Sequence, residues 1–148
     1  LVTGTPPYFD PGLSGQPAHG ESAACLFERR GGVEEYCRAA SVLLRDGGDF
    51  VVVNAVLNKE RTILAGPPHS LQPITVTTFI PKEGKKPLFC VVHFVKEERR
   101  GGGGGGGSGE EILTIRDKDG KWTEEYERVL LDMGKPIKKD REKKGEAK

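Results

Sequence analysis

Residues 50–56 are the stretch that most limits what this chain can fold into. Their sequence, Phe-Val-Val-Val-Asn-Ala-Val, is almost continuously apolar and rich in β-branched side chains. Such a run is typical of a strand buried on both faces in the middle of a parallel sheet. An apolar strand at residues 1–3 and a helix precede it, so the three segments predict a βαβ unit. A right-handed crossover would place residues 51–56 parallel to the opening strand.

The helix of this unit is predicted from the spacing of its apolar side chains. They fall on one helical face: Val33, Tyr36, Cys37, Ala40, Leu43 and Leu44. Asp46-Gly47-Gly48 ends the helix, because glycine readily adopts the left-handed conformation that closes a helix. Residues 10–20, rich in proline and glycine, are expected to be a loop between the opening strand and this helix.

The segments after residue 56 predict a mixed sheet. A short helix is expected at Lys59–Ala65, and strands are expected at Ile74–Ile80 and Leu88–Val95. The connector between these strands, residues 81–87, is long enough for a hairpin but too short for a parallel crossover. The sequence therefore predicts an α/β fold in which parallel strands are closed by an antiparallel hairpin at one edge. We assign residues 1–97 to this domain.

A glycine run divides the C-terminal part of the chain. Residues 98–111, which include Gly101–Gly107, are expected to be a flexible linker. Residues 112–134 follow as a strand–turn–helix extension, with a strand at Ile112–Ile115 and a helix capped by Thr123. This helix is too short to persist alone, so it should dock on the domain through an apolar stripe. The stripe consists of Tyr126, Val129, Leu130 and Met133. Residues 135–148 are expected to be a disordered basic tail.

The bulk composition bears on partners and compartment. The net charge is +1 at pH 7, so no overall field favours binding to nucleic acid or to a membrane surface. No run approaches the ~18 apolar residues that a membrane-spanning helix needs. Cys25, Cys37 and Cys90 lack metal-ligand spacing, which predicts free thiols in a reducing compartment and no metal site. We expect a cytoplasmic protein, with an organelle as the alternative.

The opening strand runs directly into Thr5-Pro6-Pro7-Tyr8. This tetrapeptide resembles the Asn/Asp/Ser-Pro-Pro-Tyr active-site loop of class I S-adenosylmethionine-dependent methyltransferases that modify amino groups. The resemblance implies that Thr5 and the Pro6 carbonyl orient the amine, that Pro7 keeps the loop rigid and that Tyr8 stacks on a flat substrate. Phe9 would add a second apolar wall. Thr5 departs from the asparagine expected at this position, because its hydroxyl is shorter than a carboxamide and can donate as well as accept.

Further stretches resemble one group of these enzymes, the bacterial-type tRNA1(Val) adenine-37 N6-methyltransferases of the small-domain superfamily. They are residues 2–9, His19-Gly20-Glu21, residues 39–53 and residues 113–133, which contain Thr-Glu-Glu-Tyr. The group has its His and Glu adjacent, whereas Gly20 separates them here. The resemblance implies S-adenosylmethionine as cofactor, an adenine in tRNA as substrate and RNA as partner. Lys82, Lys85 and Lys86 would contact RNA phosphates, with an ordinary charged turn as the alternative.

In these enzymes the glycine-rich cofactor loop and the acidic ribose-binding residue lie before the motif. We therefore interpret the chain as the C-terminal half of a Rossmann-like methyltransferase sheet, without cofactor-binding residues and without activity on its own. Two other interpretations stay open: a protein glutamine N5-methyltransferase, and a non-catalytic remnant or partner-binding module. His93 is expected to be a satisfied core histidine, and Trp122 is expected to pack over the start of the last helix.

Overall fold

A computed structural model describes residues 1–8, 31–97 and 108–136. Several features predicted from the sequence lie outside these residues: the apolar wall at Phe9, the loop at residues 10–20, His19 to Glu21 and the glycine run. Residues 98–107 of the expected linker and residues 137–148 of the expected tail lie outside them too.

Five strands of the described residues form one mixed sheet in the order β1-β2-β4-β3-β5. The strands are β1 (Val2–Gly4), β2 (Asp49–Ala55), β3 (Leu71–Ile80), β4 (Phe89–Lys96) and β5 (Gly109–Thr114). β1 and β2 are parallel, with Thr3 opposite Val51. β4 runs antiparallel to both of its neighbours, β2 and β3. The predicted α/β class, the parallel pairing of the first two strands and the antiparallel hairpin of β3 and β4 are therefore confirmed. The expected place of this hairpin at one edge of the sheet is wrong, because β5 pairs with the outer side of β3 and leaves both hairpin strands inside the sheet.

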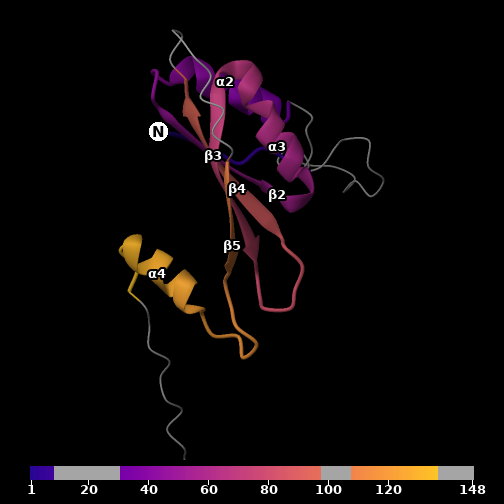
Figure 1. Ribbon diagram of the computed structural model, residues 1–148, viewed down its shortest axis with the longest axis vertical. Coiled ribbons are helices and arrows are strands. Elements are labelled where there is room, and N and C mark those ends of the chain that lie inside the picture. Colours follow the sequence, from indigo (N-terminus) through magenta and orange to yellow (C-terminus); the bar gives the residue numbers. More distant parts are fainter. Residues whose placement is uncertain (9–30, 98–107, 137–148) are drawn as a thin grey trace, which may run out of the picture.

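The helices α2 (Val33–Leu43) and α3 (Lys59–Ala65) lie together against one face of the sheet, and α4 (Glu124–Asp132) lies apart from them beside β5 (Figure 1). Two short 3₁₀ turns, η1 (Val56–Asn58) and η2 (Pro67–His69), flank α3. One apolar core fills the space between α2, α3 and the sheet. Its largest side chains are Phe50 and Phe94, whose rings stack with centroids 5.9 Å apart.

The second face of the sheet is more open than the sequence predicts. In β2, Phe50, Val52 and Asn54 are buried, whereas Val51 and the other alternate residues are only half-buried. The prediction that this strand is buried on both faces is therefore wrong. The physical reason is that α2 and α3 cover one side of the strand, while successive side chains point to opposite sides.

The rim of α2 also differs from its prediction. Tyr36 and Leu43 were expected on the buried face, but their exposed fractions are 37% and 73%. Only a narrow stripe of the helix meets the sheet, because β1 is the last described strand on that side. The Tyr36 ring instead packs beside Gly4, where a Cβ atom would come within 2.8 Å of the ring. Glycine at this position is what allows the close approach.

The C-terminal extension is part of the main sheet. β5 pairs in parallel with β3 from Gly109 onward, so the strand begins before the predicted Ile112 and includes residues assigned to the linker. Thr123 caps α4 as expected, since its hydroxyl accepts from the Tyr126 N–H at 3.2 Å. The apolar stripe is only half-buried, and Met133 is 63% exposed because the helix ends at Asp132. Met133 is therefore mostly exposed, contrary to its expected place on the docking face.

The environment of His93 agrees with its prediction only in part. His93 is hydrogen-bonded to Asp49 at 2.8 Å, but 35% of its side chain is exposed. It lies on the open face of β4, so it is satisfied without being a core residue. Among the described residues, no helix is long and apolar enough to cross a membrane.

Candidate functional site

The carboxyl ends of β1 and β2 bring the predicted motif next to the turn η1, which contains Asn58. Residues 5–8 leave the end of β1, and η1 leaves the end of the neighbouring parallel strand β2. Parallel strands place their carboxyl ends at the same edge, and ligands of open α/β sheets commonly bind there. This edge is therefore the candidate functional site.

The motif forms a corner with one anchored residue and one accessible residue. Pro6 is fully buried, whereas Thr5 is exposed and Pro7 and Tyr8 are half-buried. The two prolines fix their own φ angles and have no N–H group, so the backbone of the corner offers carbonyl acceptors. The exposed Thr5 hydroxyl is available to a ligand, while the buried Pro6 anchors the corner to the fold.

A hydrogen-bond network ties this corner to the end of β2. The Asn58 side-chain amide donates to the Tyr8 carbonyl at 2.9 Å and to Asn54 Oδ1 at 3.2 Å. The Asn54 amide donates in turn to the Thr62 hydroxyl at 3.0 Å, and this hydroxyl donates to the Asn58 carbonyl at 2.8 Å. Asn54 and Thr62 are buried, with exposed fractions of 1% and 0%. The backbone of the corner is therefore anchored to a buried network in which each polar side chain has a hydrogen-bond partner.

The sequence interpretation did not include Asn54 and Asn58. A signal was present, because Asn54 interrupts an otherwise β-branched apolar run. A carboxamide at a buried strand position is costly unless it is hydrogen-bonded, so its presence indicates a local network. Which partners complete this network depends on the turn after the strand and on α3.

A wide-open hollow of about 350 Å³ lies beside the exposed residue of the corner. It is lined by Thr3, Gly4, Thr5, Tyr36, Val51 and Val53. Aliphatic groups, hydroxyl groups and one aromatic ring are therefore available to a flat, weakly polar ligand. Such a surface suits a planar ring with one or two hydrogen-bonding groups better than it suits a charged ligand.

The same hollow does not fit the cofactor that the resemblance implies. S-adenosylmethionine carries an ammonium group, a carboxylate and ribose hydroxyls, which need charged or strongly polar partners. None of the described residues that line the hollow is charged. The described part of the chain therefore provides a surface beside the motif but no pocket for the cofactor.

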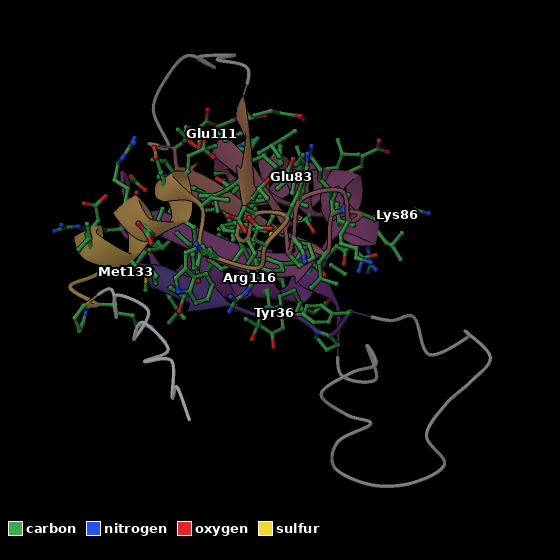
Figure 2. The ribbon with its side chains drawn as sticks, turned by 90° about the horizontal axis from the view of Figure 1, so that it is seen from below. Tyr36, Glu83, Lys86, Glu111, Arg116 and Met133 are labelled. Atoms are coloured by element: carbon green, nitrogen blue, oxygen red, sulfur yellow. The ribbon has the colours of Figure 1, made fainter. Side chains whose placement is uncertain are left out.

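The predicted phosphate-binding lysines lie at the same edge of the sheet. They belong to the turn between β3 and β4, and the backbone of this turn contacts η1, where the Val56 N–H donates to the Leu88 carbonyl at 3.2 Å. Lys85 and Lys86 are exposed and Lys82 is half-buried. The Lys86 side chain points away from the ribbon (Figure 2). The lysines thus extend the candidate edge, without a described contact to the corner.

The aromatic residue before α4 has a structural role. The centroids of the Trp122 and Tyr126 rings lie 5.0 Å apart. The Arg116 guanidinium lies over the Trp122 ring, 3.9 Å from the centroid of that ring. This contact confirms that Trp122 packs over the start of the helix.

The buried cysteines behave as apolar residues. Cys37 and Cys90 are free and buried in the core. Burial, with a smaller effect of the nearby Glu34 carboxylate, raises the pKa of the Cys37 thiol to about 12. Burial also raises the pKa of Cys90. Neither thiol is therefore a candidate nucleophile at neutral pH.

Comparisons with known proteins reveal distant similarity to solved structures. No protein-family model matches the chain, and no curated protein matches it. The crystal structure of a predicted O-methyltransferase from Agrobacterium tumefaciens is similar at 13% sequence identity and a TM-score of 0.49, covering 74% of this chain. The chain spans about 50% of the length of that protein.

Proposed function

We propose that this chain carries the acceptor-binding corner of an S-adenosylmethionine-dependent N-methyltransferase. Its substrate is the exocyclic amino group of a planar ring, and N6 of an adenine in tRNA is the specific proposal. The observation that carries the proposal is the placement of Thr5-Pro6-Pro7-Tyr8 at the carboxyl end of a parallel strand, with Thr5 exposed beside an open hollow.

Methyl transfer to such an amine depends on the orientation of the amine more than on acid or base catalysis. The lone pair of an exocyclic amine is delocalised into the ring, so the amine must be oriented before it attacks a methyl group. The Thr5 hydroxyl and the Pro6 carbonyl would accept the amine hydrogens, and these acceptors gain strength as positive charge develops on nitrogen. The Tyr8 ring would stack on the base, which must be turned out of its helix or loop to reach it.

The cofactor is assigned to residues outside the described part of the chain, or to another polypeptide. When bound, it would supply the sulfonium methyl group. The contribution of the described residues is to bind the flat acceptor, to orient its amine and to keep the corner rigid. Positioning of this kind can account for a large part of a rate enhancement.

A methyl-transfer assay on the full gene product that contains this chain tests the proposal. The protein would be incubated with labelled S-adenosylmethionine and a panel of unmodified tRNAs, and mass spectrometry would locate any methyl group. The proposal expects N6-methyladenine in tRNA, with strong loss in Thr5→Ala and Tyr8→Ala variants. Label on a protein glutamine would favour the glutamine N5-methyltransferase. Label that persists in the Tyr8→Ala variant would contradict the role given to the corner.

A second candidate is a non-catalytic, partner-binding module. The uncharged lining of the hollow favours it, because a protein that never binds the cofactor needs no charged residues there. A titration of the full gene product with S-adenosylmethionine separates the two candidates. Micromolar binding supports the enzyme, and absence of binding together with absence of methyl transfer supports the module.

A further inference from the structure

We infer that Asn58 is a positioning residue of the acceptor-binding corner, acting through the Tyr8 backbone to hold the Tyr8 ring in place. Its contact with Tyr8 stands on the structure alone, and its functional role rests on the proposed function. Asn58 lies in η1, the turn after β2, whereas Tyr8 follows β1, so the bond joins segments that are 50 residues apart in the sequence.

The two hydrogens of the Asn58 side-chain amide make two separate hydrogen bonds. One is donated outward to the Tyr8 carbonyl at 2.9 Å, and the other is donated inward to Asn54 Oδ1 at 3.2 Å. The bond to Asn54 therefore fixes the Asn58 side chain, and the bond to Tyr8 fixes the corner. A side chain with a single donor hydrogen, or an apolar side chain, cannot make both bonds, and an aspartate would place a negative charge between two oxygen acceptors.

The residues that support the Asn58 side chain are themselves fixed by hydrogen bonds. Asn54 is buried and bonded to Thr62, and Asn54 Oδ1 also accepts from the Ala55 N–H at 2.8 Å. The Thr62 hydroxyl fixes the Asn58 backbone from α3 at 2.8 Å. Asn58 itself is only half-buried, so it can change without opening the core. These are the properties of a residue that transmits order from a packed interior to an accessible site.

Fluorine NMR on the full chain tests this inference without an activity assay. The chain has three tyrosines, so 3-fluorotyrosine labelling gives a small set of signals that Tyr→Phe variants assign. In Asn58→Asp we expect the Tyr8 signal to shift and narrow as the ring gains motion, while the Tyr36 and Tyr126 signals stay in place. The new carboxyl group can donate to the Tyr8 carbonyl only when protonated. The Tyr8 signal should therefore return toward its wild-type position as the pH is lowered.

Leu57→Ala is the matched control, because Leu57 lies in the same turn, is 88% exposed and makes no described contact with Tyr8. It should leave all three signals unchanged. Asn58→Ala provides a second variant, with the Tyr8 shift but without recovery at low pH. An unchanged Tyr8 signal in both Asn58 variants overturns the inference. So does a joint shift of all three signals, which would make Asn58 a residue of the fold as a whole.

Methyl transfer by the full gene product then separates this inference from the proposed function. If both hold, Asn58→Asp lowers kcat by about 10-fold, the loss expected from one misplaced hydrogen-bonding group, with little change in KM for tRNA. If the Tyr8 signal responds as expected but the wild-type protein transfers no methyl group, the proposed function fails and the contact stands. If methyl transfer is normal in Asn58→Asp, the positioning role fails and the proposed function stands.

Discussion

The two faces of the sheet differ in what they can do. The face under α2 and α3 is closed, and none of its described buried side-chain polar atoms lacks a partner. The opposite face is half-open, and there Val51 and Val53 form part of the hollow that reaches Thr5. The first face supplies stability and the second is free to bind. The Asn54–Asn58 network at the end of β2 joins them, because it begins in the core and ends at Tyr8.

The largest expected effect concerns thiols on the closed face. In a Cys25→Ser background, Cys37 should react with iodoacetamide at pH 8 roughly 10²–10³-fold more slowly than the same residue in urea, since a pKa of about 12 leaves little thiolate. Because the pKa is raised, the rate should keep increasing as the pH rises above 9 instead of levelling off. Mass spectrometry of quenched samples gives the rates.

Cys90 extends this test to the sheet itself. It lies in β4, and burial raises its pKa as well, so it should also be protected in the folded protein. Rapid labelling of either cysteine at pH 8, with the protein still folded by circular dichroism, would show that α2 and α3 do not close this face.

The next largest effect is expected from the buried end of the network. Asn54→Ala removes the acceptor for the Ala55 N–H and for one Asn58 hydrogen, which should lower the free energy of unfolding by about 2–4 kcal/mol. Val53→Ala is the matched control, because Val53 is adjacent in β2 but points to the open face. It should cost less, about 1 kcal/mol. Urea denaturation measures both, and equal losses would mean that the two faces contribute alike.

The β1–β2 pairing, the β3–β4 hairpin and the helix positions could be predicted from the sequence because they follow local patterns, whereas the pairings of β2 with β4 and of β3 with β5 could not. The β-branched run at 50–56, the short connector at 81–87 and the Thr123 cap each determine their own element, and the structure confirms these elements. Burial was harder to predict, because it depends on what covers a residue. Val51 is as apolar as Val52, yet only Val52 is closed by the helices.

The site shows the same division. The corner at residues 5–8 was proposed as a site from its own residues. Its position after β1 agrees with the expectation, and its role stays a prediction. Its support could not be identified, because Asn58 and Thr62 acquire meaning only when η1 and α3 turn back toward β1. A side-chain bond across 50 residues leaves no pattern in a single sequence.

A smaller effect is expected at the first position of the corner. If the proposed function holds, Thr5→Asn would restore the carboxamide of the resembling enzymes and should raise methyl transfer several-fold, whereas Thr5→Val should lower kcat by about 10-fold, the value of one lost acceptor. Both variants should fold normally, since Thr5 is exposed. Single-turnover assays of the full gene product measure the change. A Thr5→Val protein as active as wild type would remove Thr5 from the site.

The smallest effect is expected from the lysines, which belong to neither face. If Lys82, Lys85 and Lys86 contact phosphates, changing all three to glutamine should weaken tRNA binding several-fold at physiological salt. It should also reduce the slope of log K against log salt by roughly 0.7 for each lost contact with single-stranded RNA. The rate at saturating tRNA should stay the same, because these side chains make no described contact with the corner. Lys121→Gln, at another turn of the chain, is the control for a general loss of charge. An unchanged slope in the triple variant would leave the hairpin an ordinary charged turn, and recognition of the substrate would then depend on the open face alone.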